Sequence, residues 1–114
     1  MKLITAVVKP GLRDSVMEAV SAAGAHGLTA TEVQGFGQQF GHLDEEVPMW
    51  PNWRAALLPK LRIDVVVNDA LADRVTEAIV KAVNTGTIGD GKIWITPVSA
   101  AIRVRTGERD EKAV

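Results

Sequence analysis

NTGTIGDGKIWI, residues 84–95, joins a helical pattern to a strand pattern through a turn rich in glycine. The helical spacing stops at Gly86, and the strand begins with residues 93–95. Glycine tolerates positive φ and close backbone approach, so the turn can present N–H donors to an anion, with the charge of Lys92 beside them. The alternative is a plain connection with a solvated lysine. The stretch is not a Walker motif, because Ile93 follows Lys92 and a strand follows the turn.

The composition of the chain excludes several classes of protein. Its 114 residues fit one domain, residues 1–114, and 46% hydrophobic content is enough for a core. A net charge of -1 and a pI near 6.1 argue against a general nucleic-acid or membrane-surface binder. The absence of cysteine excludes disulfides and thiolate metal sites. The apolar run at the start is too short for a signal peptide or a membrane span, so we expect a cytoplasmic protein without membrane insertion.

Hydrophobic periodicity predicts two β-α-β halves. Alternation predicts strands at 2–9, 28–34, 61–67 and 93–97, and a short one at 102–105. Apolar residues recur at helical spacing over 12–23 and, after a cap at Asn68 or Asp69, up to Val83. This order predicts an α+β fold, a ferredoxin-like βαββαβ sandwich with an antiparallel sheet, two helices on one face and a long loop between the second and third strands.

That long loop, residues 36–57, is the main irregularity of the chain. It carries glycines, a run of acids and prolines, and no periodicity. Long loops inside compact domains are usually functional or disordered. Met49, Trp50 and Trp53 lie in its middle, and such side chains either fold back on their own domain or contact a partner. The polar stretch 106–114 forms a C-terminal tail.

Arg103 and Arg105 alternate in the last expected strand and so project from one face. In the expected fold this strand lies just beyond the glycine turn, where two guanidinium groups and the residues from Gly89 to Lys92 can bracket one polyphosphate. The alternative is a pair of arginines that are solvated or bound to acidic side chains. Their convergence with the turn favours the phosphate hypothesis.

Five motifs in this order carry a resemblance to a known family: KLITAVVKP at 2–10, LTATEVQGFGQQFGH at 28–42, LPK at 58–60, TGTIGDGKIWI at 85–95 and IRVRTGE at 102–108. Over nearly its whole length the chain resembles the PII signal-transduction proteins, the nitrogen regulatory protein P-II family. The resemblance implies the ferredoxin-like fold, a homotrimer, and ATP or ADP bound in clefts between subunits. It also implies regulation without catalysis, through a long loop that engages a target transporter or metabolic enzyme.

The same resemblance implies the residues of each site. The nucleotide would contact Gly35, Phe36, Gly37, Gln38, Gln39, Val66, Gly89, Asp90, Gly91, Lys92, Arg103 and Arg105. The effector 2-oxoglutarate would contact Gln39, Gly41 and Lys60, and Gln39 would also reach a Mg²⁺ ion that bridges ATP and effector. The target protein would meet the loop at Met49, Trp50, Trp53 and Arg54.

The chain departs from the family pattern in the loop. Many members carry a loop tyrosine that is modified with a nucleotide, whereas this sequence has no tyrosine, which excludes uridylylation there. Gln38 and Phe40 stand where basic residues are frequent, so the cleft loses positive charge. The chain therefore resembles an atypical member. Two alternatives stay open: a variant that senses bicarbonate or ADP and AMP, and a small ATP-hydrolysing enzyme that uses His42 and Asp44.

Overall fold

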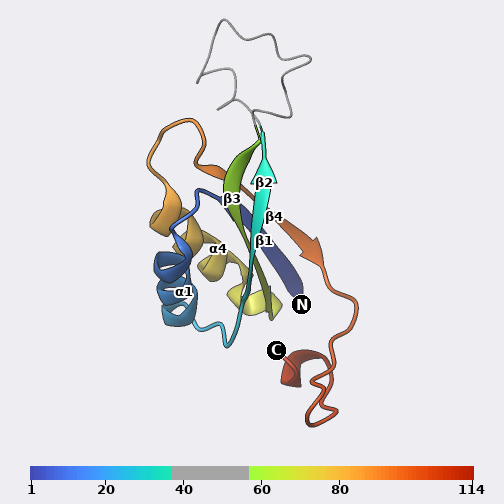
Figure 1. Ribbon diagram of the computed structural model, residues 1–114. Helices are drawn as coiled ribbons and strands as arrows, with labels where there is room; N and C mark the ends of the chain where they lie inside the picture. The colour runs from blue at the N-terminus through green and yellow to red at the C-terminus, as the bar shows by residue number, and fades with distance from the viewer. Residues whose placement is uncertain (37–56) are drawn as a thin grey trace, which may run out of the picture.

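The computed structural model describes residues 1–36 and 57–114, which form a four-stranded antiparallel sheet with helices on one face (Figure 1). The sheet order is β2-β3-β1-β4, with β1 in the centre beside β3. The bounds are β1 Lys2–Val8, α1 Arg13–Ala22, β2 Thr29–Gly35, β3 Leu58–Val67, α4 Asp69–Val83 and β4 Gly91–Pro97. This arrangement confirms the predicted α+β, ferredoxin-like fold. In the described part of the chain, no helix is long and apolar enough to span a membrane.

The core lies between the sheet and the two helices. Successive side chains of a strand point to opposite faces, so every second residue of β1 and β3 faces the helices. These positions and the inner faces of α1 and α4 are buried: Ile4, Ala6, Val8, Val16, Val20, Leu61, Ile63, Val65, Val67, Val75 and Ile79. Each fully buried aliphatic side chain contributes about 1.5–3 kcal/mol, which makes this layer the main source of stability.

The open face, which we define as the sheet face opposite the helices, carries a polar row in its centre. Thr5 pairs with Asp64 of β3 on one side and with Trp94 of β4 on the other. The Thr5 hydroxyl donates to Asp64 Oδ1 at 2.7 Å, and Arg62 Nε donates to Oδ2 at 3.0 Å. Burial acts to raise the pKa of Asp64, but the hydrogen bonds from Arg62 and Thr5 outweigh it and lower the pKa below its ordinary value.

The strand β3 begins at Leu58, three residues before the predicted start at Leu61. Its first residues include Pro59, which cannot donate to a sheet ladder. Among the described residues, Pro59 is in register with Gln34 of β2 alone, because pairing with β1 begins at Leu61. This end of β3 is therefore an edge, where proline is tolerated.

The strand predicted at 102–105 is wrong. Ile102 forms only an isolated bridge with Arg109, and a turn follows. The Gly107 N–H donates to the Arg103 carbonyl at 2.7 Å, and the Arg103 N–H donates to the Glu108 carbonyl at 2.9 Å. These local bonds fold the segment back on itself without a neighbouring strand. A 3₁₀ helix, Asp110–Lys112, closes it.

Candidate functional site

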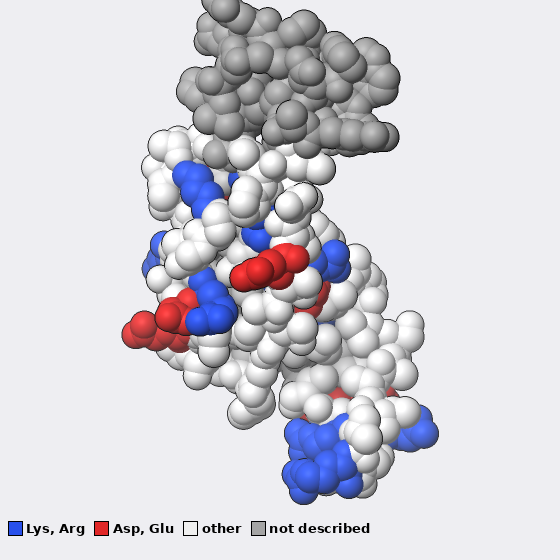
Figure 2. Space-filling model, viewed as in Figure 1, with Lys and Arg blue, Asp and Glu red and all other residues white. Residues whose placement is uncertain are grey.

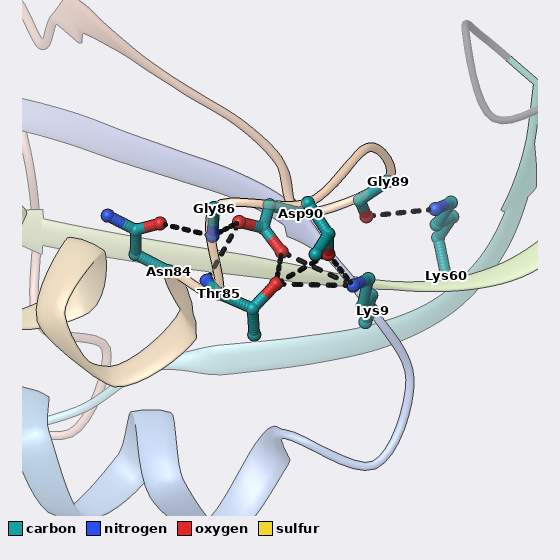
Figure 3. Close-up of polar contacts among 8 residues, drawn as sticks. Lys9, Lys60, Asn84, Thr85, Gly86, Gly89 and Asp90 are labelled. Carbon is teal, nitrogen blue, oxygen red and sulfur yellow. Dashed lines mark hydrogen bonds and ion pairs between the residues drawn. The ribbon is translucent and has the colours of Figure 1, made fainter.

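The turn between α4 and β4 is organised around the carboxylate of Asp90 (Figure 3). The N–H groups of Thr85 and Gly86 donate to Asp90 Oδ2 at 2.8 and 2.9 Å, and the Thr85 hydroxyl donates to Oδ1. Lys9 Nζ lies 3.3 Å from Oδ1. The hydrogen bond from the Thr85 hydroxyl is the largest cause of a pKa for Asp90 that is far below the ordinary value. This carboxylate holds the turn together from within.

Gly91 is required where the turn enters β4. Its φ is +101°, and a Cβ built on it would lie 1.9 Å from the carbonyl oxygen of Val7 in β1. No side chain fits at that distance. The glycine therefore lets the backbone of the turn approach β1, as the sequence motif predicts.

The open donors of the turn lie earlier than the sequence predicts. Among the described residues, the N–H groups of Thr87, Ile88 and Gly89 have no hydrogen-bond partner. The next N–H groups are not open. The backbone N–H of Asp90 donates to the Thr87 carbonyl at 3.3 Å, and Gly91 is already in register with Val8 in the sheet. Consecutive free N–H groups form a concave site for an anion. The prediction named Gly89 but missed Thr87 and Ile88.

Lysine side chains surround this turn. Lys60 of β3 donates from Nζ to the Gly89 carbonyl at 3.3 Å. Lys92, the second residue of β4, lies opposite Val7. Gly35, at the end of β2, is in register with Leu58 at the same end of the sheet. The structure thus brings Gly35, Lys60 and the residues from Gly89 to Lys92 to one end of the sheet.

The predicted arginines lie at the other end of the sheet. The strand β4 leads away from the turn and spans about 20 Å before the segment that carries Arg103 and Arg105 (Figure 1). The prediction that this segment lies just beyond the glycine turn is therefore wrong within one chain. Val66 also belongs to the far end, where it is in register with Leu3.

Basic side chains gather on the C-terminal segment at that far end, as Figure 2 shows. Arg103 is bound to an acid of the same segment, because its Nη1 lies 3.2 Å from Glu108 Oε1. Both side chains are more than one-third exposed, so this ion pair is weak. It leaves the guanidinium available to a stronger anion.

Several predicted residues lie outside the described parts of the chain: Gly37, Gln38, Gln39, Gly41, His42, Asp44, Met49, Trp50, Trp53 and Arg54. Their roles stay predictions. Within residues 1–36 and 57–114, no group of three or more His, Cys or acidic side chains is placed to hold a metal ion. Phe36, which follows Gly35, is exposed.

Fold and turn together define a ferredoxin-like domain that offers backbone donors and lysines at one end of its sheet. The family model for nitrogen regulatory protein P-II matches residues 1–108. The chain is 50% identical over 114 residues to a nitrogen regulatory protein P-II of Cereibacter sphaeroides and 45% identical to that of Rhizobium etli. It is 46% identical to the nitrogen regulatory protein GlnK of Escherichia coli, and each match covers 100% of both chains. The chain belongs to the P-II family of nitrogen regulatory proteins, which confirms the resemblance in its motifs.

Proposed function

We propose that this P-II protein binds ATP or ADP with the phosphates at the turn between α4 and β4. The observation that carries the proposal is the run of open N–H groups at Thr87, Ile88 and Gly89. Lys92 follows that run in sequence and supplies a positive charge. Backbone donors combined with lysine suit a polyphosphate, because charge-assisted hydrogen bonds are about twice as strong as neutral ones.

The other half of the nucleotide site comes from a second copy of the chain. A nucleotide that uses the turn, Val66 and Arg103 must reach residues at both ends of the sheet. One chain cannot supply both ends at once, whereas two neighbouring chains can. This argument supports clefts between subunits and, with the family, a homotrimer.

The output of the protein is the long loop, 36–57, acting on a target transporter or metabolic enzyme. With no tyrosine in the chain, control rests on which ligands are bound. Loop and turn are linked at Lys60, which lies just after the loop and donates to the Gly89 carbonyl. We propose regulation in nitrogen metabolism without catalysis, as the names of the relatives suggest.

The small effector is proposed to be 2-oxoglutarate, held by Lys60 and, through Mg²⁺, by Gln39. A dianionic acid beside a triphosphate is repelled unless cations offset the charge. Lys60 is suitably placed at the turn, whereas Gln39 lies outside the described residues. When bound, Mg²⁺ would supply positive charge that offsets the repulsion between the two anions, and Gln39 would help to hold it. In the alternative, the protein senses bicarbonate, or mainly ADP and AMP, through the same turn. Calorimetry distinguishes the two cases.

Calorimetry with ATP, ADP and AMP tests the proposed function. We expect the wild-type protein to bind ATP and ADP, and 2-oxoglutarate with Mg²⁺ to tighten ATP binding but not ADP binding, since only ATP carries the third phosphate beside the effector. A matching response to bicarbonate in place of 2-oxoglutarate identifies the variant. The absence of binding heat with all three nucleotides would show that the turn is a structural connection only.

We expect a trimer in solution. Large apolar side chains of β3 and β4 stay accessible to solvent in the single chain. Val66 of β3 is 38% exposed, and Trp94 and Ile95 of β4 are 39% and 42% exposed. A sheet with exposed apolar residues needs a cover, and neighbouring subunits supply it. Light scattering at micromolar protein should give three times the chain mass of 12.2 kDa. A mass of one chain under these conditions contradicts the proposal.

A further inference from the structure

Lys9 reaches from the end of β1 into the turn between α4 and β4. Its Nζ lies 2.9 Å from Thr87 Oγ1, 3.5 Å from Thr85 Oγ1 and 3.3 Å from Asp90 Oδ1 (Figure 3). An ammonium group has three donors and no acceptor. The three oxygens around Lys9 therefore match its full donor capacity. The two threonine hydroxyls also contact each other at 2.6 Å.

We propose that Lys9 is a positioning residue for anion binding, which fixes Thr87 and Asp90 so that the N–H groups of Thr87, Ile88 and Gly89 keep one geometry. This inference rests on the proposed function, since the anion is the nucleotide phosphate. Lys9 acts through the turn and need not touch the ligand. The sequence motifs give this lysine no role.

The turn needs such a link because its own backbone is permissive. Gly86, Gly89 and Gly91 all have positive φ, and glycine has the largest conformational freedom of any residue. Ordering a mobile loop on binding subtracts from affinity, whereas a loop that is already ordered avoids that cost. Asp90 ties the turn to itself, and Lys9 ties Asp90 and Thr87 to the sheet.

Lys9 also offsets a charge that opposes the proposed ligand. The Asp90 carboxylate lies in the turn and, alone, repels a phosphate. The Lys9 and Asp90 side chains are only 31% and 21% exposed, so water screens this pair less than it screens a surface pair. Loss of Lys9 removes the link and leaves the negative charge of Asp90 unbalanced. Both effects weaken anion binding.

The test uses full-length Lys9→Met, which keeps the length of the aliphatic chain and removes the ammonium. We expect ATP and ADP affinity by calorimetry to fall roughly threefold to tenfold, the range of one hydrogen bond. Lys9→Arg should restore part of that loss, since it returns the charge and the donors. Arg13→Met is the matched control, because it removes the exposed Arg13–Asp14 pair and should leave affinity unchanged.

Hydrogen exchange without nucleotide gives a second readout. The Thr85 and Gly86 amides, which donate to Asp90, should exchange faster in Lys9→Met, while core amides of β1 and β3 keep wild-type rates. Wild-type affinity in Lys9→Met, beside a wild type that binds nucleotide, would overturn the positioning role and leave the proposed function intact. The positioning role would also be overturned if Lys9→Met bound nucleotide weakly but had a lower melting temperature or no longer had the mass of a trimer. A wild type that binds no nucleotide would instead overturn the proposed function.

Discussion

Replacing Arg103 with alanine should weaken nucleotide binding more than about tenfold, and Lys92→Ala should have an effect of similar size. Each substitution removes a charged donor to phosphate, which contributes about 1.5–3 kcal/mol. The Arg103–Glu108 pair reduces this gain only slightly, because exposed ion pairs are weak. Calorimetry with ATP measures both effects. The control is Arg109→Ala, which removes another basic side chain of the same C-terminal segment. This variant should bind ATP as tightly as the wild type does.

Co-expression of the two variants should restore tight sites. Lys92 lies at the start of β4, whereas the segment that carries Arg103 lies beyond the other end of that strand (Figure 1). A shared cleft must therefore take the two residues from different subunits. In a ring of three subunits, every mixed trimer has one cleft that joins an intact Lys92 to an intact Arg103. We expect a tight class of sites in the purified mixed trimers and none in either variant alone. If mixed trimers bind as weakly as the parents, the two residues do not share a cleft.

The sequence predicts the sheet and helices because each element has strong local determinants. The row from Leu61 to Val67 buries every second residue, and the core side of β1 carries the buried Ile4, Ala6 and Val8, so a shift of one residue would turn these apolar side chains away from the helices. The helical faces of α1 and α4 pack on it at the expected positions, with Val16 and Ile79 fully buried. Pattern and packing agree there, so local reasoning is enough.

The segment 102–105 misled the prediction because alternation is necessary for a strand but not sufficient. Ile102 and Val104 alternate with arginines, yet a strand also needs a partner with free ladder groups. The pairing of β4 with β1 ends at Pro97, and Gly107, at φ +74°, permits a tight local turn. The backbone hydrogen bonds that Arg103 makes, with Gly107 and Glu108, both lie within the C-terminal segment. Sequence periodicity carries no information on that competition.

The turn was only partly predicted because a sequence does not reveal where a carboxylate points. Asp90 reads as part of a donor motif, but its side chain turns inward and accepts hydrogen bonds from Thr85 and Gly86. The useful signal was the neighbouring Thr85 and Thr87, whose hydroxyls suit a half-buried acid and a lysine. Lys9 was missed because a lysine at the end of a strand usually extends into solvent.

Gly91→Ala should destabilise the fold by about 3 kcal/mol or more. The new Cβ would meet the Val7 carbonyl at 1.9 Å, and the backbone at φ +101° is one that side chains disfavour. The clash involves backbone on both sides, so neither partner can move away as a flexible side chain would. The ladder between β1 and β4 begins at this pair, in which Gly91 is in register with Val8. Denaturant unfolding should show a lower midpoint with an unchanged slope.

Gly11→Ala separates the steric effect from the effect of positive φ. Gly11 has φ +85°, and nothing lies within 4 Å of a Cβ built on it, so its substitution adds strain without a clash. We expect it to cost about 1–2 kcal/mol, the penalty of a left-handed conformation alone. The difference between the two variants then measures the close approach of the turn to β1. Equal losses would mean that the turn moves away from Val7 at little cost in stability.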